Sequence, residues 1–223
     1  MWLQSLAFQS VFLGKNHWKY NRFAMSLRKQ AKTLNKKQID QLLWYVSTLR
    51  HAQRNEIVVL LSVRAGLRAK EIAGLKWAML TDADGEIGDS IRLTDVASKG
   101  RSGRIIPINM QLRLKLQDWL QEAAKQRGFD IASSHVITTE RSARTQAQAV
   151  VNMFAAWYAD VGLIGCSSHS GRRTFITNAA RKISSVGGSL RDVQALAGHS
   201  SLAITQRYIE ENKQAKQQVV ELL

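Results

Sequence analysis

Residues 169–208 read HSGRRTFITNAARKISSVGGSLRDVQALAGHSSLAITQRY, and this stretch decides how the fold is interpreted. It predicts three short helices: one that begins near His169, one opened by Ser189, and one that ends at Tyr208. Gly198 suits the left-handed position that ends one helix, and the serines after it can begin the next. The stretch therefore predicts short helices joined by tight turns.

The residues before this stretch predict more helices and a small sheet. Apolar residues recur at spacings of three and four over 39–49, after a capping box formed by Asn35 and Gln38. Further helices are predicted at 57–65, 69–77, 112–126 and 147–158. Runs typical of strands, bounded by turn residues, lie at 91–96, 104–108 and 135–139. The pattern predicts an α+β fold, mainly α, of packed helices with a small antiparallel sheet or hairpin.

The composition points to a polyanionic partner. The chain has 223 residues and a net charge of +15, from 32 Lys plus Arg against 17 Asp plus Glu. Such an excess recruits nucleic acid most commonly, with an anionic membrane surface or an acidic protein as alternatives. The longest apolar run, 153–159, is far shorter than the roughly 18 residues of a membrane span. No membrane span is predicted, and nucleic acid, not a membrane, is the expected partner.

The single cysteine and the N-terminal sequence indicate a cytoplasmic protein. Cys166 has no partner for an intramolecular disulfide and cannot build a cysteine-rich zinc site, which suits a reducing compartment. No signal peptide is predicted, because no basic residue precedes the mildly apolar start. We expect the protein in the cytoplasm, associated with the nucleoid.

The positive charge is concentrated at the N-terminus, where eight Lys and Arg precede the first acidic residue, Asp40. Residues 1–32 are interpreted as a basic leader that either contacts DNA as an arm or is an extension before a second start at Met25. No repeat and no linker rich in Pro, Gly or Ser follows. Residues 33–223 are therefore predicted to form one domain with a C-terminal tail helix.

His169 and Arg172 form the first candidate group. They are three positions apart, so on a helix both side chains can reach one ligand. Ser167 and Ser168 precede them as possible N-caps, and the N–H groups of a helix N-terminus suit a phosphate. A surface His beside an Arg is the ordinary alternative.

Five further residues are modest signals when each is taken alone. Arg68 and Glu71 are three residues apart in GLRAKEI, a spacing that ordinarily gives an exposed ion pair. Lys99 falls at a hairpin tip, where a solvated lysine is usual. His199 follows a glycine in a tight turn, and Tyr208, nine residues later, would ordinarily be a half-buried core ring.

Taken together and in order, these motifs resemble the catalytic domain of the tyrosine recombinase family, also called phage integrases. The resemblance covers about residues 33–210. Three departures remove no catalytic group: Gly171 where the family often has Leu, Arg173 where it often has His, and Ala197 where Leu often precedes Gly-His. The separate helical domain with which family members usually clamp DNA is expected to be absent.

The resemblance implies that Tyr208 attacks a DNA phosphate, forms a 3′-phosphotyrosyl bond and releases a 5′-hydroxyl. Arg68 and Arg172 would clamp the non-bridging oxygens, since guanidinium forks match phosphate. His199 would donate a further hydrogen bond. No metal, cofactor or ATP is implied, because the covalent intermediate keeps the energy of the broken bond.

The remaining implied roles concern protons and positioning. His169 would handle the proton of the phenol, whose ordinary pKa is about 10. Lys99 would protonate the leaving 5′-oxygen. Glu71 would hold the Arg68 helix and its guanidinium in place.

The implied partners are double-stranded DNA and further copies of the chain, in a dimer or tetramer joined through the tail 210–223. That tail could equally pack on its own domain. Three alternatives to a site-specific recombinase stay open: a topoisomerase of type IB, which nicks and reseals one strand, a catalytically silent DNA-binding regulator on the same fold, and a basic RNA-binding protein.

Overall fold

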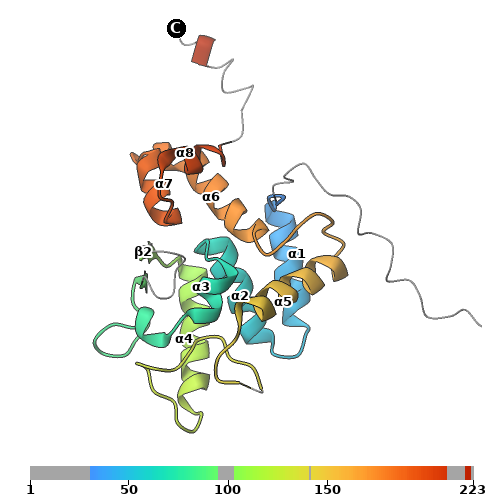
Figure 1. Ribbon diagram of the computed structural model, residues 1–223, viewed down its shortest axis with the longest axis vertical. Coiled ribbons are helices and arrows are strands. Elements are labelled where there is room, and N and C mark those ends of the chain that lie inside the picture. Colours follow the sequence, from blue (N-terminus) through green and yellow to red (C-terminus); the bar gives the residue numbers. More distant parts are fainter. Residues whose placement is uncertain (1–30, 95–102, 141, 210–218, 222–223) are drawn as a thin grey trace, which may run out of the picture. The chain divides into compact units, whose positions relative to one another are not determined.

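The computed structural model describes residues 31–94, 103–140, 142–209 and 219–221 and confirms the predicted fold class (Figure 1). Its α-helices are α1 (Lys36–Ser47), α2 (Ala52–Arg64), α3 (Ala69–Gly74), α4 (Met110–Ala124), α5 (Ala147–Asp160), α6 (Ser170–Lys182), α7 (Leu190–Ala197) and α8 (Leu202–Gln206). Strands β1 (Ser90–Leu93) and β2 (Arg104–Pro107) pair antiparallel, and short 3-10 turns follow α3 and α6.

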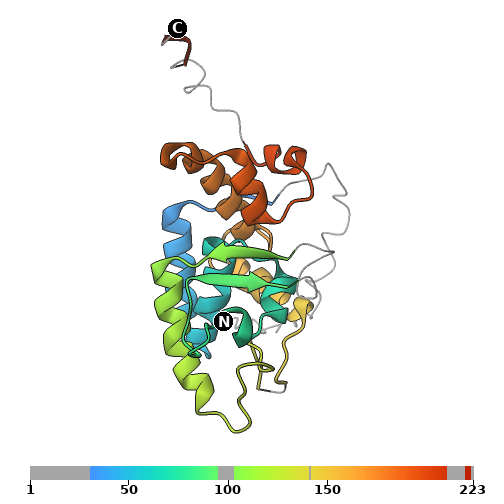
Figure 2. The ribbon, with the colours of Figure 1, turned by 90° about the vertical axis from the view of Figure 1, so that its left-hand side faces the viewer.

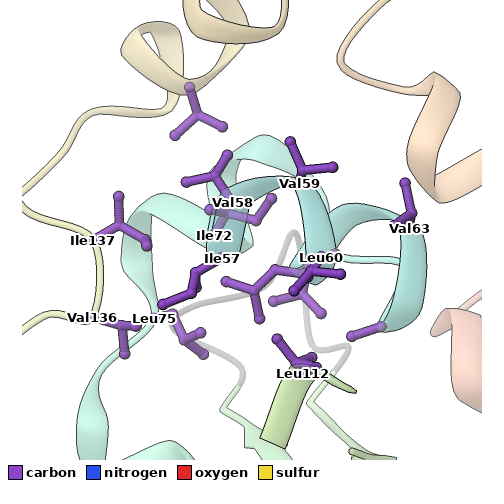
Figure 3. Packing of buried hydrophobic residues seen from close by; sticks show 14 of the residues in the cluster. Ile57, Val58, Val59, Leu60, Val63, Ile72, Leu75, Leu112, Val136 and Ile137 are labelled. Carbon is purple, nitrogen blue, oxygen red and sulfur yellow. The ribbon is translucent and has the colours of Figure 1, made fainter. Parts of the chain in front are cut away.

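Helix α2 forms the centre of the main core. Its residues 57–61 are all at most 1% exposed, so the helix is apolar on nearly every side. Figure 3 shows residues 57–60 of this run gathered with other members of the same buried cluster: Ile72 and Leu75 from the α3 region, Leu112 from α4, and Val136 and Ile137 from the segment after α4. Such a surrounded helix fixes the positions of the elements packed against it.

The ends of the helices follow their local sequence. The side chain of Asn35 accepts from the Gln38 amide at 2.9 Å, and Gln38 accepts from the Asn35 amide at 3.0 Å, which confirms the predicted capping box. Helix α3 ends at Gly74, before the predicted end at Trp77. There the buried Leu75 is extended and Trp77 begins a 3-10 turn.

The small sheet is made of β1 and β2, which lie side by side (Figure 2). Ile91 pairs with Ile106, and both side chains are buried. The run predicted at 91–96 is a strand over Ser90–Leu93, and the run predicted at 104–108 is a strand over Arg104–Pro107. Residues 95–102 lie outside the described part of the chain. The predicted strand at 135–139 is wrong. Its first residue, His135, forms a single bridge to Lys76, because the chain turns into the 3-10 helix directly after that lysine.

The last third of the chain has a smaller core of its own. Ile176 of α6 and Val193 and Ala197 of α7 are buried together in one cluster. Helix α6 joins this cluster to the main core, because Gly171 lies against α2: a Cβ added there would be 2.2 Å from Ser62 Oγ. This close approach explains why glycine stands at position 171.

The two ends of the chain are described only in part. The predicted basic leader lies outside the described residues except for its last two positions, and of the tail only 219–221 are described, as a helical turn. No helix within the described ranges combines the length and the apolar character needed to cross a membrane.

Candidate active site

Arg68 lies at the start of α3, where the backbone before it is tightly constrained. Gly66 has a φ of +66°, and a Cβ at that position would be 2.4 Å from a ring carbon of Phe175. The Arg68 side chain is 27% exposed, and its Nη1 donates to Glu71 Oε1 at 2.8 Å. The backbone beside Arg68 and its contact with Glu71 thus fix the arginine, while part of its side chain stays accessible from solvent.

Glu71 is fully buried, so the ordinary interpretation of this pair as an exposed ion pair is wrong. Burial by itself raises the pKa of the Glu71 carboxyl. The hydrogen bonds and charges of Arg104 and Arg68 outweigh it, and the pKa is lowered. Glu71 is therefore a buried carboxylate that its arginine neighbours keep charged.

Arg172 is the buried cation of the site, with 4% of the residue exposed. Its Nη1 donates to the carbonyl of Gly66 at 2.7 Å and its Nη2 to the carbonyl of Ala197 at 2.6 Å. Burial lowers the pKa of Arg172 to about 10, with repulsion from Arg68 in the same direction, so it stays charged at neutral pH. One guanidinium thereby holds the loop before α3 and the end of α7.

His199 and Tyr208 lie side by side. Gly198, with a φ of +60°, ends α7, and the imidazole of His199 then stacks on the Tyr208 ring with centroids 5.2 Å apart. The guanidinium of Arg173 lies 5.8 Å from the centroid of the same ring. Thr177 Oγ1 donates to the Tyr208 carbonyl at 3.2 Å. The phenol thus lies beside an imidazole and close to cations.

The pKa of His199 is strongly displaced. Burial lowers it to about 4, and the charges of the neighbouring arginines act in the same direction. Its Nδ1 lies 3.0 Å from the hydroxyl of the buried Thr205. The imidazole is therefore neutral at pH 7 in the protein without DNA.

Of the two remaining predicted site residues, the structure describes His169 but not Lys99. His169, not Ser167 or Ser168, is the N-cap of α6. It is exposed, and its Nδ1 lies 3.4 Å from Ser168 Oγ. It precedes Arg172 by one helical turn, as its spacing predicted. Lys99 lies outside the described residues.

Arg104, the first residue of β2, is a polar member of the site that the sequence interpretation missed. Its side chain is 5% exposed, and its Nη1 and Nη2 donate to the two oxygens of Glu71 at 2.9 and 3.1 Å. A signal for it exists in the strand pattern, because residues two apart share a face and Ile106 faces the core.

The site brings three arginines, a neutral imidazole and a phenol together from separate parts of the chain. Such an arrangement suits an anion, because preset positive charge stabilises negative charge that develops in a phosphoryl transfer. Within the described ranges, no three His, Cys, Asp or Glu side chains lie together as a metal site.

Sequence comparison gives a family match over most of the chain. The model of the "Phage integrase family" matches residues 32–215. A tyrosine recombinase XerC of Shewanella amazonensis is 30% identical over 189 residues, which are 82% of this chain and 59% of the relative. The XerC of Actinobacillus pleuropneumoniae serotype 7 is 32% identical, over 79% of this chain and 54% of its own. The chain spans about half of the length of these relatives.

The fold of the chain also matches that of a solved structure. The Tn1549 transposon integrase in complex with circular intermediate DNA aligns with a TM-score of 0.66 and 19% identity, over 89% of this chain and 68% of the integrase. At this identity, the match concerns the fold alone.

Proposed function

The chain belongs to the phage integrase family, and from this membership we propose that it is a site-specific DNA recombinase with Tyr208 as its nucleophile. The observation that carries the proposal is the contact between the rings of Tyr208 and His199, 5.2 Å apart, beside the arginine cluster. A silent DNA-binding regulator would need the cations, but it would have no use for a phenol at this position.

The proposed step transfers one phosphoryl group of the DNA from the 5′-oxygen to the phenol oxygen of Tyr208. The phenol oxygen of Tyr208 attacks the scissile phosphorus, the new bond from oxygen to phosphorus forms, and the bond to the 5′-oxygen breaks. The proton of the phenol passes to a base, and the 5′-oxygen takes up a proton as it leaves. The strand then carries a 3′-phosphotyrosyl link, which a 5′-hydroxyl of another strand can attack in reverse.

Arg68 and Arg172 are proposed to bind the non-bridging oxygens of this phosphate. Arg172 uses two of its five N–H groups for the carbonyls of Gly66 and Ala197, and these bonds orient the rest of the fork. A pre-oriented guanidinium stabilises the transition state without reorganising during the reaction. The same chemistry supports a reaction that needs neither metal nor ATP.

His199 is proposed to donate to the phosphate from Nε2. When the Thr205 hydroxyl donates to Nδ1, 3.0 Å away, the ring proton resides on Nε2. The low pKa of His199, about 4, supports a neutral donor in the protein without DNA. A bound phosphate would raise that pKa and strengthen the bond.

The family resemblance supplies the remaining roles. His169 would accept the phenol proton, and Lys99 would protonate the 5′-oxygen. The partner would be double-stranded DNA in the cytoplasm, with copies of the chain associating on it through the tail 210–223. Each of these roles is part of the proposal.

The test uses DNA that the protein itself selects. Duplexes bound from a randomised pool are rebuilt with a nick near each candidate phosphate, so that the short cleaved fragment diffuses away and the adduct accumulates. We expect a protein–DNA adduct that survives denaturant with the wild type and none with Tyr208→Phe. The reaction should proceed with a chelator present and without ATP.

Two results would overturn this proposal. An adduct that persists in Tyr208→Phe would exclude Tyr208 as the nucleophile. Catalytic relaxation of any supercoiled plasmid, with no preferred site and no partner duplex, would identify a topoisomerase of type IB.

A further inference from the structure

The carboxylate of Glu71 is surrounded by donors from two different arginines. Oε1 accepts from Arg68 Nη1 at 2.8 Å and from Arg104 Nη1 at 2.9 Å. Oε2 accepts from the Arg68 amide at 2.7 Å and from Arg104 Nη2 at 3.1 Å. One buried negative charge is therefore shared between two positive charges.

Arg104 also reaches the turn that carries the histidine of the site. Its Nε donates to the carbonyl of Leu196 at 2.9 Å, and the next carbonyl, that of Ala197, accepts from Arg172. A Cβ added at Gly198 would be 2.9 Å from Arg104 Cδ, so the turn packs directly on this side chain. A single guanidinium thus joins β2, α3 and the end of α7.

We propose that Arg104 is a positioning residue of the strand-transfer site. It holds Glu71 and balances its negative charge, so that Glu71 does not cancel the positive charge with which Arg68 attracts the DNA phosphate. The inference rests on the proposed function. It assigns to Arg104 an electrostatic role through Glu71 and no contact with the DNA.

The argument is one of charge balance at short range. Arg68, Arg104 and Arg172 with Glu71 carry a net charge of +2 in the wild type. Without Arg104, the carboxylate is left with Arg68 as its paired cation, and the net charge falls to +1. In a buried setting, charges a few ångströms apart interact several times more strongly than in water, so the loss reduces the attraction for a phosphate.

The same balance identifies a compensating change. Glu71→Gln combined with Arg104→Gln removes one charge of each sign and restores the net charge of +2. A merely structural clamp would also lose less in the double variant than in Arg104→Gln, because removing both partners leaves no unpaired buried charge, so the rates are read together with the titration of His199 described below.

The experiment measures the single-turnover rate of adduct formation at saturating protein, on the same selected nicked duplexes. We expect Arg104→Gln to lower the rate between about 10- and 100-fold, the range found when the outer partner that orients a metal ligand is removed. The double variant should recover most of that loss. Arg104→Lys keeps the charge without the fork, and we expect a smaller reduction.

Arg113→Gln is the matched control, because Arg113 pairs with the exposed Asp89 at 2.7 Å on the surface. It removes one arginine and one ion pair outside the site, and its rate should equal that of the wild type. Thermal melting of each variant checks that the protein compared is folded.

A second readout needs no strand cleavage. Arg104 is one of the cations that lower the pKa of His199, so in Arg104→Gln the imidazole should titrate at higher pH, as followed by its NMR signals. Arg113→Gln should leave this titration unchanged. Arg104→Lys, which keeps the charge, should also leave it nearly unchanged, and a large shift in that variant would contradict a role through charge even if the glutamine variant does not fold.

Three results would overturn the inference: a wild-type rate in Arg104→Gln, a double variant slower than Arg104→Gln, or an unchanged His199 titration in Arg104→Gln. Failure of the proposed function looks different, because the wild type would then form no adduct or Tyr208→Phe would still form one. In that case, the titration alone decides whether Arg104 acts on the site through its charge.

Discussion

Helices α2 and α6 pack against each other but differ in the side chains that they bury. Those of α2 are mostly apolar, with Asn55 and Ser62 as polar exceptions, and those of α6 are mostly polar. Along α2, an unbroken apolar run from Ile57 to Leu61 is at most 1% exposed. Along α6, most of the buried positions are polar or glycine, namely Ser170, Gly171, Arg172, Thr174 and Thr177, with Ile176 as the exception.

The difference separates what stabilises the fold from what positions the site. Apolar burial on α2 contributes free energy in proportion to the area removed from water. The buried polar groups of α6 must instead find partners, as Arg172 does with two carbonyls and Thr174 with the carbonyl of Ser170 at 2.8 Å. Activity should therefore tolerate the exchange of one apolar side chain for another on α2. It should not tolerate the loss of a hydrogen-bond donor on α6.

The largest effect on this comparison is expected from a substitution that creates a cavity beside α2. Leu60→Ala should lower the free energy of unfolding by about 2–5 kcal/mol, because it removes a side chain that is 1% exposed and leaves a cavity. Denaturant titration measures this loss. The folded protein should still form the adduct at the wild-type rate, and a rate that collapses in folded protein would count against the separation.

The second largest effect should come from Arg172→Lys, which keeps the charge but cannot hold the carbonyls of Gly66 and Ala197 with one planar fork. Adduct formation should fall by at least about 100-fold, the cost of losing one preset donor to an oxyanion. Single-turnover kinetics on nicked duplexes measure it. A lysine variant within a few-fold of the wild type would show that positive charge alone suffices.

The contact between the two helices gives the third prediction. Gly171→Ala should destabilise the protein by about 1–3 kcal/mol, because the added Cβ would lie 2.2 Å from Ser62 Oγ. Thermal melting should show the loss. Ser62→Ala removes an Oγ that is buried without a partner in the described structure, so the double variant should recover part of it. Additive losses would contradict this contact.

The smallest effect concerns pH. The unfolded chain protonates His199 near pH 6.5, whereas in the folded state its pKa is lowered to about 4. The unfolded state therefore binds more protons between these values, and stability falls as the pH drops through that window. Melting temperatures from pH 7 to pH 5 should fall more steeply in the wild type than in His199→Gln. Parallel profiles would contradict the low pKa.

Local signals in the sequence were sufficient to predict most of the helices and the hairpin, whereas α2 begins at Ala52, before the predicted start at 57. The capping box of Asn35 and Gln38 and the turn at Gly198 depend on neighbours within a few residues, and both are confirmed. The family resemblance is confirmed by the match over residues 32–215. The roles assigned to the site residues stay predictions.

Features that depend on residues far apart in the chain could not be predicted from the sequence. The burial of Glu71 depends on Arg104, 33 residues away in the sequence, and the spacing to Arg68 alone indicated an exposed pair. The strand predicted at 135–139 failed for a similar reason, because the residues that would pair with it turn away after Lys76.

The most direct test of the account is to identify the residue that carries the DNA. After digestion of the adduct with trypsin and nuclease, mass spectrometry should find the nucleotide on the peptide that begins at Tyr208, after Arg207, linked through its 3′-phosphate to the phenol. A nucleotide on any other residue, or one linked through a 5′-phosphate, would contradict the account.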